Sequence, residues 1–214
     1  AGDVRAWDDV PEYCDYLGGQ LRDIVWDDAV PLVLGGEHTV TAPAVEAVDP
    51  EVFVCLDAHL DLREAYDGNA WSHACVTRRV LRTVDEAIVL GARTGSEAEW
   101  ERADAEDVTV VAPEDVDDWL ADPPGFGDRA AYLSVDIDAA DPGFAPGTGT
   151  MEPFGLTPRQ MRDVVRTVAP YCEGVDVVEV NDRDDGQTAA LAGKLLREFV
   201  FAHAAAADRA AGDR

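Results

Sequence analysis

The stretch VFVCLDAHLD, residues 52–61, decides the fold, because an unbroken apolar run leads directly into alternating acidic and histidine side chains. Apolar runs of this kind, rich in β-branched residues, are typical of strands that are buried on both faces of a parallel sheet. Side chains alternate along an extended segment, so Asp57, His59 and Asp61 point to one side and offer oxygen and nitrogen donors together. The stretch therefore predicts a central strand with a polar site at its carboxyl end.

Short apolar runs of the same kind recur along the chain and alternate with longer segments of helical spacing. The predicted strands are Val30–Leu34, Val52–Leu56, Ala87–Leu90, Val108–Val111, Ala131–Val135 and Val175–Val180. The predicted helices are Ser72–Val84, Glu97–Ala103, Thr157–Val168 and Thr188–Ala207, and turn-rich loops are predicted at Asp122–Gly127 and Asp141–Thr150. This alternation predicts an α/β fold with a three-layer, mostly parallel sheet and helices on both faces. Residues 1–214 fit a single domain.

The charge of the chain is strongly negative: 44 acidic residues stand against 17 basic ones, and Lys194 is the only lysine. This balance predicts no nucleic-acid partner, no membrane partner and an acidic surface adapted to high salt. No apolar run approaches the roughly 18 residues of a membrane span, and no signal-peptide pattern is present. The cysteines are scattered without metal-binding spacing, so we expect reduced thiols in a cytoplasmic protein.

Two further motifs place polar side chains at the ends of predicted strands. His38 belongs to GGEHT (35–39), and Asp136 and Asp138 belong to SVDID (134–138). Functional side chains of open parallel sheets gather at the carboxyl ends of the strands, so we expect these residues to meet those of the first motif. The six candidate metal ligands are His38, Asp57, His59, Asp61, Asp136 and Asp138.

The donor set indicates the kind of metal. Six nitrogen and oxygen donors without a thiolate exceed what one zinc ion needs, and they favour hard or borderline divalent ions such as manganese. Two dications would balance four ionised aspartates, and together they would acidify a bound water for hydrolysis. A single DxHxD string can arise by chance in so acidic a chain. A second strand-end DxD motif and a strand-end histidine, in a chain with few histidines, argue for a metal site.

The runs GGEHT, DAHLD and SVDIDAADPGFAPGTGT (134–150) resemble, in order and spacing, the signature regions of the ureohydrolases, the arginase and agmatinase family. The resemblance covers nearly the whole chain and is strongest for archaeal agmatinases. It implies an arginase-like fold with two Mn²⁺ per chain, one held by His38, Asp57, Asp61 and Asp136 and the other by Asp57, His59, Asp136 and Asp138. It also implies that the N-terminal strand and loop of typical members are missing here, and that the protein is a homo-oligomer, a trimer or hexamer.

Three residues receive catalytic roles through the resemblance. Asp61 would hold the proton of the attacking water, His73 would give a proton to the leaving amine, and Glu179 would grip the substrate guanidinium. From the residues alone, His73 also fits a surface histidine and Glu179 a buried salt bridge. Glu37 stands where the family often has aspartate and is expected to orient the neighbouring His38. The fourth histidine of the chain, in the Ala-rich C-terminal segment, is expected to face solvent.

The resemblance implies that a small guanidino substrate is hydrolysed to urea, and agmatine, which would yield putrescine for polyamine biosynthesis, is the first choice. Glu64 and Asp67 are expected to attract the ammonium group of agmatine, and Arg63 is expected to be neutralised by a neighbouring acid. Alternatives within the family are an arginase, a guanidinobutyrase or an aminopropylagmatine ureohydrolase. Alternatives from other classes are a one-zinc amidohydrolase or deacetylase of related fold and a non-catalytic family member.

Overall fold

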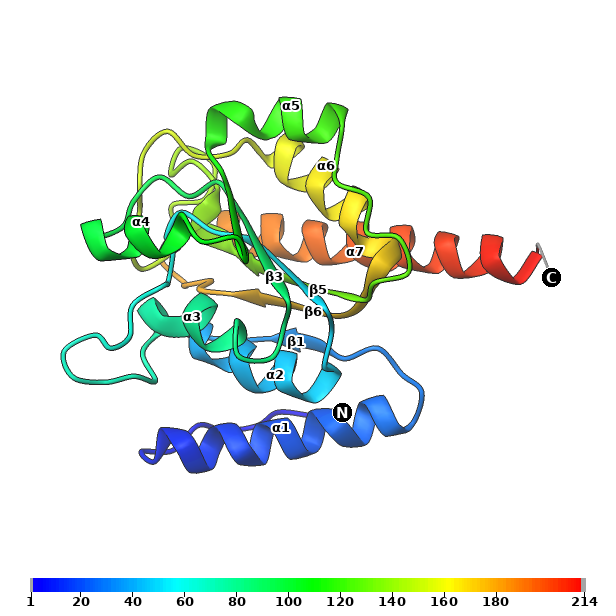
Figure 1. The fold of residues 1–214 in the computed structure, drawn as a ribbon, viewed down its shortest axis with the longest axis horizontal. Helices are drawn as coiled ribbons and strands as arrows, with labels where there is room; N and C mark the ends of the chain where they lie inside the picture. The colour runs from blue at the N-terminus through cyan, green and yellow to red at the C-terminus, as the bar shows by residue number, and fades with distance from the viewer. Residues whose placement is uncertain (1, 213–214) are drawn as a thin grey trace.

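A computed structural model describes residues 2–212, and Figure 1 shows a sheet with helices on its two faces. The strands follow the order β1-β6-β5-β2-β3-β4, and each neighbouring pair is parallel. Their bounds are β1 (Leu32–Leu34), β2 (Val52–Leu56), β3 (Glu86–Leu90), β4 (Val108–Val111), β5 (Ala131–Asp136) and β6 (Cys172–Val178). The predicted α/β fold with a parallel sheet is confirmed.

The helices fall into two groups on opposite sides of the sheet (Figure 1). One side carries α1 (Val10–Trp26), α2 (Thr41–Val48) and α3 (Val76–Val80), and the other carries α5 (Val116–Ala121), α6 (Pro158–Val168) and α7 (Gln187–Gly212). A further helix, α4 (Glu97–Ala103), packs against β4. None of the helices within residues 2–212 combines the length and the apolar character that a bilayer crossing needs.

Apolar clusters join each helical layer to the sheet. Phe53 and Tyr132 face α1 and α2, whereas Leu56 and Leu133 face α6 and α7. Strands β2 and β5 are buried along their whole length, because both of their faces are covered. Double burial explains why these strands show no polar alternation in the sequence.

The local sequence signals account for some helices and miss others. Thr157 caps α6 and forms a reciprocal capping box with Gln160, so this predicted helix begins where expected. The predicted helix at Ser72–Val84 is wrong in length, since only a 3₁₀ turn, His73–Cys75, and the short α3 form there. Sequence patterning also misses α1, α2 and α5. Helix α1 contains an interior glycine pair, which lowers its helix propensity, and α2 is buried nearly all round, so it shows no amphipathic period.

The strand register brings the polar strand ends to one edge of the sheet. Leu56 of β2 lies beside Val135 of β5, so Asp57 and Asp136 follow at the same level. Asp136 in turn lies beside Val178 of β6, which is followed directly by Glu179. The sheet therefore gathers side chains from distant parts of the sequence at its carboxyl edge, as expected for this topology.

Candidate metal centre

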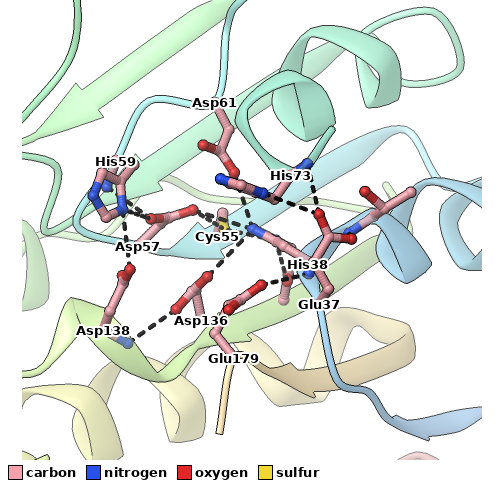
Figure 2. A network of polar contacts seen from close by, with 12 residues as sticks. Glu37, His38, Cys55, Asp57, His59, Asp61, His73, Asp136, Asp138 and Glu179 are labelled. Atoms are coloured by element: carbon pink, nitrogen blue, oxygen red, sulfur yellow. Dashed lines mark hydrogen bonds and ion pairs between the residues drawn. The ribbon is translucent and has the colours of Figure 1, made fainter. Parts of the chain in front are cut away.

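The structure brings all six predicted metal ligands together at the carboxyl edge of the sheet, as Figure 2 shows. His38 begins the 3₁₀ turn after β1, and the aspartates and histidine of DAHLD follow β2. Asp136 ends β5, and Asp138 lies in the 3₁₀ turn that follows it. Five of the six are buried, with exposed fractions of 4% or less, and His59 is half-buried. The buried five are His38, Asp57, Asp61, Asp136 and Asp138.

One imidazole nitrogen of His38 faces three carboxylates. Its Nδ1 lies 3.1 Å from Oδ2 of Asp61 and 3.4 Å from the nearest oxygens of Asp57 and Asp136. This Nδ1 is buried and makes no hydrogen bond. Its opposite nitrogen, Nε2, lies 3.2 Å from the Ser134 hydroxyl. A buried nitrogen that lacks a hydrogen-bond partner and is ringed by carboxylates marks a place suited to a cation.

The second imidazole lies on the other side of Asp57. His59 Nδ1 is 3.0 Å from Oδ2 of Asp138 and 3.5 Å from Oδ1 of Asp57. Backbone N–H groups fix the carboxylates: Ala58 donates to Asp138, His59 to Asp57, and Asp138 to Asp136, at 2.7–3.0 Å. Donor atoms of Asp57, His59 and Asp138 all lie within 4.8 Å of one another, which suits a shared ion.

The electrostatics of this cluster call for positive charge. Burial, and then the charges of Asp61 and Asp138, raise the pKa of Asp57 to about 7. Burial and its acidic neighbours likewise raise the pKa of Asp136 well above its ordinary value. Burial acts to lower the pKa of His38, yet the surrounding carboxylates outweigh it and raise that pKa to about 10. Crowded carboxylates that resist ionisation beside a strongly basic imidazole fit the oxygen and nitrogen donor set of divalent cations.

A cysteine also borders the cluster. Cys55 Sγ lies 3.9 Å from Asp57 and 4.0 Å from His38 Nε2. Burial raises the pKa of this thiol well above its ordinary value, which disfavours the thiolate form. The prediction of free cysteines is confirmed for the described residues. Cys55 also forms, with His38 and Asp57, a group whose donor atoms lie within 4.8 Å of one another.

A cavity of about 560 Å³ opens above the cluster. Asp61, His73 and Glu179 line it together with Glu99 and Glu152. Asp61 and Glu179 both adopt the left-handed backbone region, with φ of 50° and 60°. For a glutamate this conformation is costly, and such residues cluster where the side chain must point at a ligand. The three predicted catalytic side chains thus line one pocket.

The role expected of Glu37 needs correction. Its carboxylate does not contact the His38 ring; it accepts a hydrogen bond from the backbone N–H of His73 at 2.8 Å and lies 3.1 Å from His73 Nδ1. The same side chain also caps the turn at Thr39. Glu179 instead accepts the backbone N–H of His38, at 2.8 Å. Glu37 therefore positions the predicted proton donor rather than a metal ligand.

The residues expected to recognise the substrate tail also differ. Glu64 is 82% exposed at its side chain and pairs with Arg78, and neither it nor Asp67 lines the cavity. That prediction is wrong, because the loop after DAHLD turns these two side chains outward. Arg63 does line the cavity, and its Nε lies 3.2 Å from Oε2 of the buried Glu99, so it has the acidic neighbour expected for it.

Sequence patterning did not identify the structural role of Arg93, in the loop after β3. Its guanidinium donates to six backbone carbonyls at 2.7–3.3 Å, those of Gly91, Asp138, Ala139, Ala140, Glu152 and Pro153. The only signal was an arginine just past a strand end. Arg93 therefore links the turn that contains the predicted ligand Asp138 to the loop that contains Glu152, which lines the cavity.

The histidine of the C-terminal helix does not face solvent, contrary to expectation. His203 Nδ1 lies 3.1 Å from the carbonyl of Ala169, and its ring stacks on Phe199 with centroids 5.7 Å apart. The apolar side of α7 packs against α6 and the turn that follows it, so this histidine is a packing residue.

Comparisons with known proteins agree with this geometry. The sequence model of the arginase family matches residues 1–202. The chain is 38% identical to N(1)-aminopropylagmatine ureohydrolase of Thermococcus kodakarensis, over 78% of this chain and 60% of that protein. It is 36% identical to an agmatinase of Pyrococcus horikoshii, over 78% of this chain and 61% of the relative. The chain thus spans about three fifths of the length of these two relatives.

The fold is shared with solved structures. Agmatine ureohydrolase of Thermoplasma volcanium superposes with a TM-score of 0.86 at 35% identity, covering 94% of this chain and 72% of that one. A putative agmatinase from Clostridium difficile gives a TM-score of 0.83 at 28% identity, covering 94% and 76% of the two chains. The resemblance read from the three motifs is confirmed.

Proposed function

The chain belongs to the arginase family, and from that premise we propose that it hydrolyses agmatine to urea and putrescine at a centre of two Mn²⁺ ions. The observation that carries the proposal is the buried ring of four aspartates around two imidazoles beneath an acidic cavity. Two relatives are named an agmatinase and an aminopropylagmatine ureohydrolase, which supports a substrate with a guanidinium group and an amine tail.

The proposed ligands divide into two overlapping sets. One ion would be held by His38, Asp57, Asp61 and Asp136, and the other by Asp57, His59, Asp136 and Asp138. When bound, such ions act as Lewis acids that lower the pKa of a coordinated water. The absence of a thiolate and the number of carboxylates favour manganese over zinc. Asp57 and Asp136 belong to both sets, and these are the two aspartates whose pKa burial raises most clearly.

The side chains around the cavity have complementary tasks in the proposed reaction. Glu179 offers a carboxylate to the planar guanidinium, which prefers paired acceptor oxygens. Asp61, which lines the cavity, would take the proton of the attacking water. His73, exposed at the cavity wall and held by Glu37, would donate a proton to the leaving amine, a role suited to imidazole.

The proposed preference for an amine tail rests on the charge of the cavity wall. Glu99 and Glu152 line the wall beside the candidate catalytic residues, and Glu99 pairs with Arg63. Carboxylates at this wall attract an ammonium group and disfavour a substrate carboxylate by like-charge repulsion. The guanidinium of Arg63 pairs with Glu99, so these two charges offset each other and Glu152 supplies the remaining negative charge of this wall. Agmatine therefore fits this wall better than arginine or guanidinobutyrate.

Urea release tests this proposal directly. The full chain, loaded with Mn²⁺ in high salt, is assayed with agmatine, aminopropylagmatine, arginine and guanidinobutyrate. We expect kcat/KM to be highest for one of the two amine-tailed substrates. A higher value for arginine or guanidinobutyrate would reject the amine-tail assignment, and no urea from any of the four would reject the ureohydrolase activity.

Metal counting separates the remaining alternatives. A zinc amidohydrolase or deacetylase would hold one ion per chain, whereas the proposed centre holds two. A non-catalytic member would be expected to have lost ligands, and each of the six proposed positions carries a suitable side chain. We further propose, as the resemblance implies, that residues 1–214 act as one domain within a homotrimer or homohexamer.

A further inference from the structure

A carboxylate lies buried in the middle of the sheet, outside the candidate metal centre. Asp176 belongs to β6 and has an exposed fraction of 0%. Its Oδ2 accepts a hydrogen bond from the Tyr132 hydroxyl at 2.9 Å, and its Oδ1 accepts one from the Ser134 hydroxyl at 2.6 Å. Burying a carboxylate bonded to hydroxyl groups rather than to a basic side chain is costly. A carboxylate that is kept buried at this energetic cost indicates a functional role for Asp176.

The hydrogen bonds of Asp176 fix the orientation of its neighbour. In its ionised form Asp176 only accepts hydrogen bonds, and Ser134 then donates its hydroxyl proton to Asp176 Oδ1. The Ser134 oxygen then offers a lone pair to His38 Nε2, which lies 3.2 Å away. This lone pair requires the proton of the imidazole to sit on Nε2. The other nitrogen, Nδ1, is left facing the carboxylates of Asp61, Asp57 and Asp136.

We infer that Asp176 and Ser134 are positioning residues that hold His38 with Nε2–H toward the sheet and the Nδ1 lone pair toward the metal. The inference rests on the proposed metal-dependent function, because it assigns the two residues to one ion of that centre. Partners behind a metal-bound histidine fix its tautomer and ring orientation, and their loss typically lowers metal affinity about 10- to 100-fold. The ion affected is the one proposed for His38.

The chain offers matched variants for a test. In Asp176→Asn the amide can donate to Ser134, which lets the Ser134 hydroxyl donate to His38 Nε2 and so favours a proton on Nδ1. Ser134→Ala removes the acceptor, and Ser134→Thr keeps a hydroxyl. Tyr132→Phe is the control, since it removes the other hydrogen bond to the same carboxylate without touching the path to His38.

The experiment measures release of Mn²⁺ from the loaded full-length chain against a graded chelator, with metal counted by elemental analysis. We expect Asp176→Asn and Ser134→Ala to release one of the two ions at a chelator strength about 10- to 100-fold lower. Ser134→Thr should restore retention, and Tyr132→Phe should retain both ions like the unchanged chain. Thermal melting in excess Mn²⁺ identifies variants that fail to fold. Because Ser134→Ala tests the same path, it decides the question if Asp176→Asn does not fold.

Two results would overturn the inference while leaving the proposed function intact. One is unchanged metal release in Asp176→Asn and Ser134→Ala. The other is an equal loss in Tyr132→Phe, because the carboxylate would then support only the packing of the sheet. If the unchanged chain binds no Mn²⁺ at all, the proposed function fails and the inference fails with it.

Discussion

Replacing Arg93 by lysine should destabilise the protein more than any other conservative arginine change in the described chain. The guanidinium of Arg93 reaches six backbone carbonyls, including those of Asp138 and Glu152. A lysine ammonium has about three donors on a flexible stem and cannot reproduce this fork. About three carbonyls would lose their donor.

The expected loss follows from those carbonyls. A buried carbonyl left without a donor costs about 1–3 kcal/mol, so three would cost about 3–9 kcal/mol. Arg93 is only half-buried, so water can replace part of the loss, and we expect about 3–5 kcal/mol. For a chain of this size each kcal/mol lowers Tm by about 2–4 °C, which gives a decrease of about 6–20 °C.

The assay is thermal unfolding of Arg93→Lys beside a matched control, Arg102→Lys. Arg102 makes a two-pronged pair with Asp107, both bonds at 2.7 Å, at the surface. Such a partly exposed pair contributes about 1 kcal/mol or less. If Arg93→Lys lowers Tm by no more than Arg102→Lys does, the six carbonyl contacts do not stabilise the fold and the reasoning is refuted.

Three further predictions concern the site and the surface. His73→Ala should keep both metals but lower kcat about 10²- to 10⁴-fold in urea-release assays, and an unchanged kcat would make it a surface histidine. Asp57→Ala should lose both ions by elemental analysis and His59→Ala chiefly one, whereas full activity in Asp57→Ala would end the two-ion proposal. The net charge of −27 predicts that Tm and activity rise with molar KCl, because screening shortens the Debye length to about 3 Å; a flat response would contradict this.

The sequence was most informative where chemistry and local pattern coincide. DAHLD and SVDID each follow a buried strand, so the alternation of side chains along the backbone was enough to predict which donors point together. The parallel pairing of β2 with β5 then brings Asp57 and Asp136 side by side. This predicted proximity depends only on strand-end geometry, which a single sequence can reveal.

The sequence was least informative where a side chain acts across long separations. Asp176 looks like one acidic residue in an apolar strand, and only the fold shows it bonded to Ser134 behind His38. The outward turn of Glu64 and its pair with Arg78 likewise depend on the packing of α3. Such partners are fixed by tertiary packing, so no periodic pattern in the sequence marks them.

The candidate metal centre is built from strand ends, whereas the cavity wall is built from loops and helix starts, and this difference bears on substrate specificity. The candidate metal ligands follow strands whose register fixes their spacing, so a change there disturbs the whole cluster. The cavity wall is carried by loops and helix starts instead, with Arg63 after the first motif, Glu99 on α4 and Glu152 in the loop before α6. Loops on a rigid scaffold tolerate change. Changes in these loops can therefore alter which substrate tail the cavity prefers, while the candidate metal ligands keep their geometry.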